Sequence, residues 1–326
     1  MLKLLQITKL INTFEVMKVT IYISNYNIIG GVERFVLNFI KRMSKHYDIT
    51  LLYDNVDTFQ QLIEASKYAD VEKIDKSKIH ECDVFICSSA WGLEPYNYVN
   101  AKKYIQVVHA DYSYYIKGWN FKYTKHPKTT HHVCVGKTVA DAFKVATPYK
   151  SDAVIFNLTD NEVKAIPKQK NNKLHLVTIS RISPEKGFER MLQLSKLIPV
   201  DYEWHVWGNT QTSYANSIIP KFPKNVKFHG VTTNPYNEIA KADYLVQLSD
   251  TEGYCYSVIE SLQMATPCLI TPFASGNEQI KNKMNGYIID FELKNINFDE
   301  IINDIPIVEP YKDKSTEQDW IKLIES

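Results

Sequence analysis

Two glutamates in the stretch DTEGYCYSVIESLQ, Glu252 and Glu260, are spaced to act on one ligand. Glu252 follows the strand-like run DYLVQLS, and a helical pattern begins near Tyr256 or Ser257, so Glu260 falls within the first turns of that helix. Free backbone N–H groups at a helix start bind phosphate oxygens, and carboxylates accept hydrogen bonds from sugar hydroxyls. The helix dipole favours a carboxylate at this place in any protein, which is the ordinary explanation of Glu260 alone.

Two other loops contain residues that suit a phosphate ligand. Gly30 and Gly31 in SNYNIIGGVERF separate a strand from a helix, where glycines let the backbone approach a ligand closely. Arg181 and Lys186 in SRISPEKGFERML lie at a second strand–helix junction and could grip a diphosphate. The alternatives are a plain tight turn and a solvated surface pair. Neither G-x-G-x-x-G nor G-x-x-x-x-G-K-[ST] occurs, so the sequence lacks the dinucleotide and P-loop fingerprints.

The elements that must position these loops alternate between short apolar runs and amphipathic helical patterns. Runs such as VTIYIS, DVFICSS and DYLVQLS are continuous and β-branched, which is typical of parallel strands buried on both faces. We therefore predict an α/β protein with two Rossmann-like, doubly wound domains facing each other across a cleft. The expected parts are an N-terminal extension (1–16), a first domain (17–158), a linker (159–173), a second domain (174–308), and a C-terminal helix that could pack back on the first domain (309–326).

Bulk composition excludes several classes of protein. A net charge of +1 argues against nucleic acid as a partner. Five scattered cysteines without C-x-x-C indicate reduced thiols, and no run of 18 apolar residues suggests a membrane-spanning helix. We expect a cytoplasmic protein that could also lie at the inner face of the cell membrane. Charge is nevertheless uneven, because residues 101–150 contain nine Lys against two Asp, a local balance of +7.

Taken in order, the motifs resemble those of the retaining, nucleotide-sugar-dependent glycosyltransferases of family 4, which have the GT-B fold. The E-x7-E of that family corresponds to Glu252 and Glu260, and its R…PEKG segment to residues 181–187. VVHADY matches the element that carries the family's active-site histidine, here His109. The Gly-Gly loop, VIFNLTD and ATPCLIT extend the resemblance over most of residues 17–290. The resemblance implies that 17–158 is the acceptor-side domain and 174–308 the nucleotide-sugar-binding domain.

The resemblance implies a role for each matching residue. It assigns catalysis to His109 and Glu252, and ribose binding to Glu260. It also implies that Gly253 lies with His109 and Glu252 at the donor sugar. The donor diphosphate would be bound by Arg181, Lys186, Gly30, Gly31, Tyr254, Cys255, Tyr256 and Ser257. Cys255 is a departure, since the family often has Gly there, and it makes donor identity harder to predict.

The implied activity is transfer of a hexosyl or N-acetylhexosaminyl group, with retention, from a nucleotide sugar, UDP-sugar favoured over GDP-sugar. The acceptor would be a glycan or a lipid-linked saccharide. No Asp-x-Asp occurs for holding a metal, so we predict an enzyme without metal or other cofactor. The alternatives are a nucleotide-sugar epimerase or phosphorylase of the same fold, the latter lacking an identifiable pyridoxal Lys, and a non-catalytic nucleotide-sugar-binding partner protein.

The stretch 112–132, YSYYIKGWNFKYTKHPKTTHH, mixes aromatic residues with Lys and His on the acceptor side. It could contact an anionic membrane and a lipid-diphosphate acceptor, or form an aromatic platform for sugar rings. A solvated loop with a few packed aromatics is the ordinary alternative. His131 and His132 are adjacent on a predicted strand and point apart, so we predict no metal site there. Lys-, Asn- and Ile-rich usage suggests a low-GC bacterium, where such enzymes commonly build capsule or other surface polysaccharides.

Overall fold

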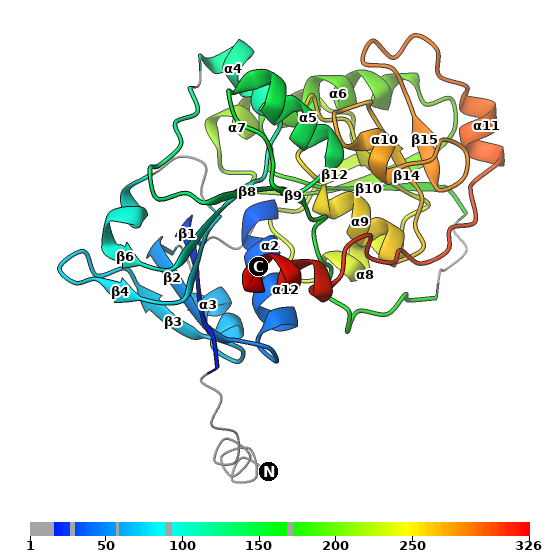
Figure 1. Ribbon diagram of the computed structural model, residues 1–326. Coiled ribbons are helices and arrows are strands. Elements are labelled where there is room, and N and C mark those ends of the chain that lie inside the picture. Colours follow the sequence, from blue (N-terminus) through cyan, green and yellow to red (C-terminus); the bar gives the residue numbers. More distant parts are fainter. Residues whose placement is uncertain (1–15, 27–29, 57–58, 89–92, 121, 168–171) are drawn as a thin grey trace.

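The computed structural model describes residues 16–26, 30–56, 59–88, 93–120, 122–167 and 172–326 (Figure 1). The predicted N-terminal extension therefore lies almost wholly outside the described residues. Two parallel sheets organise the chain, one in each half, with helices around them (Figure 1). The predicted α/β class with two Rossmann-like layers is confirmed.

The first sheet has the strand order β3-β2-β1-β5-β7-β8-β9, and every neighbouring pair is parallel. Its central strand β5 is buried along its whole length, which is why VFIC has no polar alternation. The strands are β1 (Lys18–Asn25), β2 (Asp48–Asn55), β3 (Asp70–Lys73), β5 (Val84–Cys87), β7 (Lys103–Val108), β8 (His131–Cys134) and β9 (Ala153–Val154), with a separate pair β4 (His80–Glu81) and β6 (Val99–Asn100). The helices are α2 (Gly31–Met43), α3 (Phe59–Ala65), α4 (Tyr112–Trp119) and α5 (Lys137–Ala146), with one 3-10 turn (Glu94–Tyr98).

The second sheet has the order β12-β11-β10-β13-β14-β15 and is also parallel throughout. Its order reverses between β10 and β13, so the loops after these two strands meet at one edge. The strands are β10 (Leu174–Ile179), β11 (Tyr202–Trp207), β12 (Val226–Phe228), β13 (Tyr244–Gln247), β14 (Cys268–Ile270) and β15 (Gly286–Ile288). The helices are α6 (Phe188–Leu197), α7 (Ser213–Ile218), α8 (Pro235–Ala240), α9 (Tyr256–Gln263), α10 (Gly276–Gln279) and α11 (Phe298–Asn303), with 3-10 turns at Pro184–Lys186 and Ile219–Lys221.

The last helix, α12 (Glu317–Glu325), packs against the first domain although it follows the second (Figure 1). Its buried residues Trp320, Leu323 and Ile324 recur at helical spacing and join the core around α2. The Trp320 ring lies 5.9 Å from the Phe35 ring and 5.1 Å from the Phe39 ring, centroid to centroid. A capping box between Thr316 and Asp319 fixes where this helix begins.

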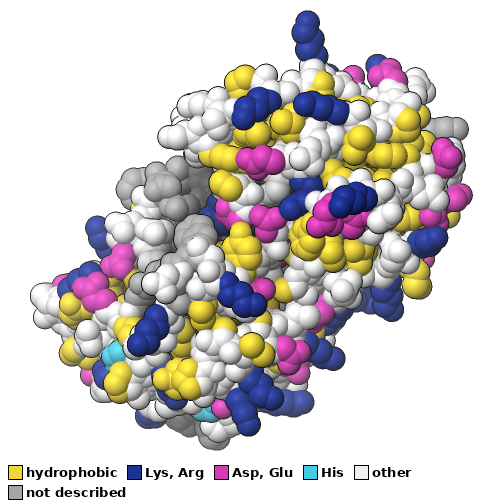
Figure 2. Space-filling view, turned by 90° about the horizontal axis from the view of Figure 1, so that it is seen from above, with side chains coloured by type: hydrophobic (Ala, Val, Ile, Leu, Met, Phe, Trp, Pro, Cys, Tyr) yellow, Lys and Arg dark blue, Asp and Glu magenta, His cyan; other side chains and the backbone are white. Residues whose placement is uncertain are grey.

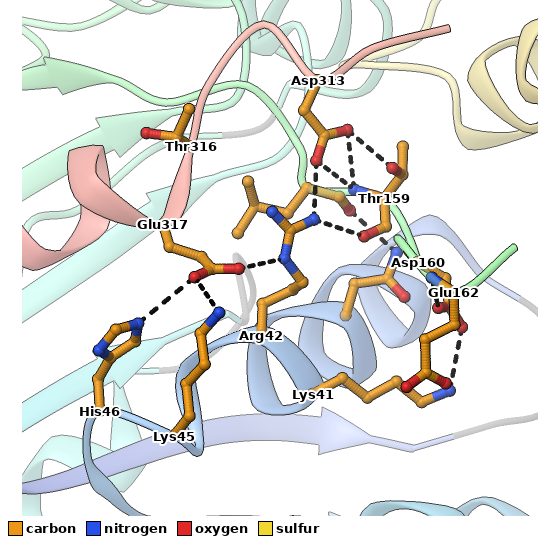
Figure 3. A network of polar contacts seen from close by, with 12 residues as sticks. Lys41, Arg42, Lys45, His46, Thr159, Asp160, Glu162, Asp313, Thr316 and Glu317 are labelled. Carbon is orange, nitrogen blue, oxygen red and sulfur yellow. Dashed lines mark hydrogen bonds and ion pairs between the residues drawn. The ribbon is translucent and has the colours of Figure 1, made fainter. Parts of the chain in front are cut away.

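A polar network secures the same junction (Figure 3). Arg42 at the end of α2 donates to Glu317 Oε1 at 2.6 Å, to Asp313 Oδ2 at 2.9 Å and to the Thr159 carbonyl at 3.1 Å. Burial works against the charge of Glu317, but hydrogen bonds from Lys45, Arg42 and His46 outweigh it and lower its pKa to about 2. One guanidinium thus joins the first domain, the crossing segment and the start of α12.

Replacing Trp320 by Ala is expected to lower the free energy of unfolding by about 3–5 kcal/mol, because it empties a fully buried site in the core of the first domain. Urea denaturation followed by circular dichroism measures the loss. Lys322→Ala, on the exposed face of the same helix, is the matched control. Equal stability of the two variants would show that α12 contributes little to the first domain.

Candidate active site between the two domains

Glu252 lies in the loop between β13 and α9, and one of its two carboxylate oxygens is held by three donors. Oε1 accepts from Lys186 Nζ at 2.7 Å, from Ser249 Oγ at 2.7 Å and from Gln247 Nε2 at 3.4 Å. No donor among the described residues reaches Oε2. The carboxylate is therefore fixed at one oxygen and open at the other, which is the arrangement a ligand hydroxyl needs.

Lys186 comes from the loop after β10, 66 residues before its partner in the chain. Its side chain is 13% exposed and that of Glu252 is 11% exposed. Burial alone would lower the pKa of the ammonium, but the Glu252 carboxylate outweighs burial and raises it. Lys186 therefore carries its positive charge into the site at neutral pH.

Glu260 lies in the second turn of α9 and pairs with a residue of the other domain. Arg34 Nε, from the first turn of α2, is 3.1 Å from Glu260 Oε1, and the glutamate is 5% exposed. Burial raises the pKa of this carboxyl, and the guanidinium opposes that shift. As with Glu252, no donor among the described residues reaches the second oxygen.

His109 follows β7 and faces the same loop across the domain boundary. A Cβ placed on Gly253 would lie 1.7 Å from the His109 carbonyl oxygen, so only glycine fits there. The His109 ring meets the Phe35 ring edge-on at 4.7 Å. Its Nε2 is buried and has no hydrogen-bond partner within the described part of the chain, so a bound molecule could supply one. Burial lowers the pKa of His109 to about 3, so its imidazole is neutral at physiological pH.

The start of α9 is packed between the domains. The helix begins at Tyr256, as predicted, and Tyr254, Cys255 and Tyr256 are each less than a tenth exposed. The Cys255 N–H donates to Gln279 Oε1 at 3.2 Å, so this one predicted phosphate donor already has a protein partner. The Tyr256 hydroxyl donates to the Leu158 carbonyl of the first domain at 3.0 Å.

The remaining predicted residues lie at the margins of this site. Arg181 has a side chain 60% exposed and is 3.5 Å from Glu185, so it is free to move toward a ligand in a way that Lys186 is not. Gly31 opens α2, and a Cβ there would lie 3.8 Å from the Tyr256 ring. Gly30 precedes it as the N-cap residue. Gly31 thus faces the start of α9, whereas a Cβ on Gly30 would meet the Glu33 side chain; residues 27–29 lie outside the described part.

Several residues of the site were not predicted from the sequence. Arg34 is four residues beyond Gly30, and Gln247 is a polar residue that ends an otherwise apolar strand. Both features are visible in the sequence and could have identified these residues as candidates for the site. Burial raises the pKa of both Tyr114 and Tyr115 on α4. The charges of Asp250 and Glu185 raise the pKa of Tyr114 further. Charges on the same loops also act on Tyr115: Glu185 and Glu252 raise its pKa, and Lys186 and Arg181 lower it. These two tyrosines therefore lie over the charged loops of the second domain.

The rest of the stretch 112–132 is partly structural. Tyr112 is 1% exposed, and Tyr123 packs against His132, Phe143 and Tyr149. Phe121 and the side chain of Trp119 are outside the described part. Seen from above, Lys or Arg and Asp or Glu side chains lie next to one another near the middle of the face that spans both domains (Figure 2).

Comparison with known proteins assigns the second half of the chain. Residues 159–318 match the family described as Glycosyl transferases group 1. This half is a glycosyltransferase group 1 domain. A poly(ribitol-phosphate) alpha-N-acetylglucosaminyltransferase of Staphylococcus aureus is 25% identical over 45% of this chain, which spans about a third (34%) of that relative's length.

Solved structures extend the likeness to both domains. Anabaena HepE in complex with UDP-glucose has a TM-score of 0.72 and 15% identity, covering 89% of this chain and 92% of that one. A variant of S. aureus TarM in complex with Fondaparinux, alpha-GlcNAc-glycerol and UDP has a TM-score of 0.59 and 19% identity, covering 74% of this chain and 55% of that one. These likenesses identify the fold as GT-B, with the group 1 domain as its second half.

Replacing Gly253 by Ala is expected to separate the loop of the group 1 domain from the first domain, because the added methyl cannot occupy the space of the His109 carbonyl oxygen. Hydrogen–deuterium exchange should rise at residues 107–110 and 253–257. Gly118→Ala in α4 is the control, since nothing lies within 4 Å of a Cβ there. Unchanged exchange in Gly253→Ala would contradict the close contact.

Lowering the pH is expected to destabilise the protein partly through His109. The folded state keeps this imidazole neutral, while the unfolded chain protonates it near its ordinary pKa of 6.5. The unfolded state then binds more protons, so stability is lost as pH falls from 6.5 toward about 3. His109→Gln should show a smaller loss of unfolding free energy between pH 7 and pH 5, measured by urea titrations. His131→Gln on β8 is the control, and an identical pH dependence in His109→Gln and the unmodified protein would refute the assignment.

Proposed function

We propose that the chain is a retaining glycosyltransferase that moves a hexosyl or N-acetylhexosaminyl group from a UDP-sugar to a saccharide acceptor. The observation that carries this proposal is the state of the two glutamates. Each has one oxygen held by a cation and the other without a donor among the described residues, and they lie on either side of the start of α9. Glu252 faces the donor sugar, Glu260 the ribose, and the helix start between them the diphosphate.

The donor base is the part of the proposal for which the relatives offer support. HepE was crystallised with UDP-glucose and a TarM variant with UDP. The same base in this chain is an inference from a shared fold and the group 1 domain.

The proposed chemical step uses the charged groups of the site. The bond between the anomeric carbon and the diphosphate oxygen breaks, and the acceptor hydroxyl bonds to that carbon on the same face. The hydroxyl proton passes to the departing phosphate oxygen, so charge and atoms balance. Lys186, with Arg181 brought in from the surface, stabilises the leaving diphosphate. Neutral His109 accepts or donates a hydrogen bond at the donor sugar through Nε2.

These cations make a metal unnecessary in the proposed reaction. Turnover is accordingly expected to survive chelation by EDTA. If EDTA abolishes activity and Mg²⁺ or Mn²⁺ restores it, the proposed metal independence is wrong. That result would leave the proposed donor site unchanged.

The acceptor is proposed to be a glycan or lipid-linked saccharide bound by the first domain. Tyr114 and Tyr115 form an edge-to-face pair with centroids 5.5 Å apart, which suits contact with a sugar ring. Tyr115→Ala should raise the acceptor KM more than the donor KM. The S. aureus relative acts on poly(ribitol-phosphate), so polyol phosphates belong in the acceptor screen, with capsular saccharides.

Contact of 112–132 with an anionic membrane, at the inner face of the cell membrane, is a separate proposal. Among the helices of the described ranges, none has the length and apolar character to cross a bilayer. Peripheral contact would rest on lysines such as Lys117 and Lys122, which are exposed. Absence of co-sedimentation with phosphatidylglycerol vesicles at low salt would count against it.

The direct test is turnover of UDP-glucose, UDP-GlcNAc and GDP-mannose by the purified chain, with UDP and GDP compared in thermal shift. Transfer or slow hydrolysis of a UDP-sugar with release of UDP is expected. Conversion of a UDP-sugar to its epimer without UDP release would favour an epimerase. Binding of a UDP-sugar with neither reaction would favour a non-catalytic binding protein.

Substitutions of the two glutamates are expected to impair different steps, turnover for Glu252 and UDP binding for Glu260. Glu252→Gln should lower turnover by about 10²–10³-fold while UDP affinity holds, because the lost charge acts at the reacting sugar. Glu260→Gln should weaken UDP binding by about 10-fold or more, because it removes a charged acceptor for the ribose hydroxyls. Calorimetry with UDP and turnover assays measure both, and exposed Glu309→Gln is the control. Identical profiles for the two variants would contradict this division of roles.

A further inference from the structure

Gln247 is a buried amide that the proposed reaction does not itself use. It ends β13, in the run YLVQ, and is 1% exposed. Burying an amide at the end of an apolar strand is costly unless its hydrogen bonds are made. Its side chain makes them on both sides, and both sides lead into the candidate site.

On one side the amide nitrogen acts on Glu252 through Ser249. Gln247 Nε2 donates to Ser249 Oγ at 2.6 Å, and Ser249 Oγ donates to Glu252 Oε1 at 2.7 Å. A hydroxyl has a single proton, so the bond received from Gln247 leaves that proton to point at the glutamate. A second, longer contact of 3.4 Å runs directly from Gln247 Nε2 to Glu252 Oε1.

On the other side the amide oxygen accepts a hydrogen bond from the first turn of α9. Ser257 Oγ donates to Gln247 Oε1 at 3.3 Å, and Cys255 Sγ lies 3.2 Å from Ser257 Oγ. Turning the amide over would set its NH2 against Ser257 and its oxygen against Glu252 Oε1, so two acceptors would meet. The Glu252 carboxylate therefore fixes the orientation of the amide, and the Ser257 hydroxyl, which can donate or accept, connects that amide to the first turn of α9.

We propose that Gln247 is a positioning residue that couples the first turn of α9 to the sugar-facing carboxylate of Glu252. The reactive role of Glu252 rests on the proposed function; the coupling rests on the hydrogen bonds. A diphosphate bound at the start of α9 would lie on the helix turn that carries Ser257. The Ser257–Gln247–Ser249 chain then holds Glu252 Oε1 in place and leaves Oε2 directed to the donor sugar.

Gln247→Met keeps the length of the side chain and removes its hydrogen bonds. It is expected to lower the turnover of UDP-glucose or UDP-GlcNAc, assayed as UDP release, by about 10–100-fold with UDP affinity unchanged, as supporting residues around a reactive group typically do. Gln263→Met is the matched control, because Gln263 is also a buried amide of the group 1 domain but donates to the Asp160 carbonyl at 3.2 Å. Equal losses of turnover in the two variants would show that Gln247 has only a structural role.

Gln247→Glu provides a readout that a structural role would not move. As a carboxylate it repels Glu252, whereas protonated it donates to Ser249 as the amide does. The ratio of its turnover to that of the unmodified chain should therefore rise as pH falls from 8 to 5. A ratio that is flat or falls with decreasing pH would overturn the proposal.

Coupling is tested in a Glu252→Gln background. If Gln247 acts through Glu252, adding Gln247→Met there should cost no further turnover and no further selectivity for UDP-glucose over UDP in calorimetry. Additive losses would contradict the coupling. If the chain hydrolyses neither donor, the proposed activity fails, and the ratio of UDP-glucose affinity to UDP affinity is measured instead of turnover. An equal loss of this ratio in Gln247→Met and Glu252→Gln would still support the coupling of Gln247 to Glu252. Absence of any UDP-glucose binding overturns both.

Discussion

The whole site depends on one close approach, the packing of the Gly253 backbone against the carbonyl of His109. Any side chain at 253 would hold the two domains apart, since its Cβ would overlap the carbonyl oxygen. With glycine there, Tyr254 and Tyr256 enter the core of the first domain, and α9 begins at the domain boundary. The carboxylates at 252 and 260 are thereby brought to a surface that the other domain completes.

Helix α2 is the counterpart of this loop in the first domain, and successive residues of one helix serve different partners. Gly31 faces the Tyr256 ring, Arg34 pairs with Glu260, and Phe35 packs on the His109 ring. At its far end Arg42 binds Asp313 and Glu317. Because Phe35 also contacts Trp320, the C-terminal helix supports the residue against which His109 is packed. A shift of α2 would therefore disturb Glu260, His109 and α12 together.

The sequence was sufficient for the local parts of this arrangement. Continuous apolar strands predicted parallel sheets, and the helical pattern beginning near Tyr256 or Ser257 predicted the start of α9, because strand burial and helix initiation are encoded within a few residues. The resemblance placed Lys186 and Glu252 at one donor site, Lys186 at the diphosphate and Glu252 at the sugar, but their direct ion pair was not predicted. The Arg34–Glu260 pair was not predicted, because it depends on how two separately folded layers dock. Gln247 was overlooked for a related reason: a polar residue ending a buried strand shows its purpose only when Ser249 and Ser257 fold onto it.

Charge burial separates the two ion pairs from ordinary stabilising contacts. Removing carboxylates from water costs several kcal/mol each, and donors at only one of the two oxygens leave much of that cost uncompensated. Glu260 has Arg34 alone, and Glu252 has Lys186 with two neutral donors. Well-packed apolar residues would give a more stable boundary between the domains. A buried glutamate whose second oxygen meets no donor in the described part of the chain is therefore best explained by a ligand that supplies hydroxyl groups. The same reasoning applies to Nε2 of His109, which has no partner among those same residues, and the three atoms belong to residues that converge on the start of α9.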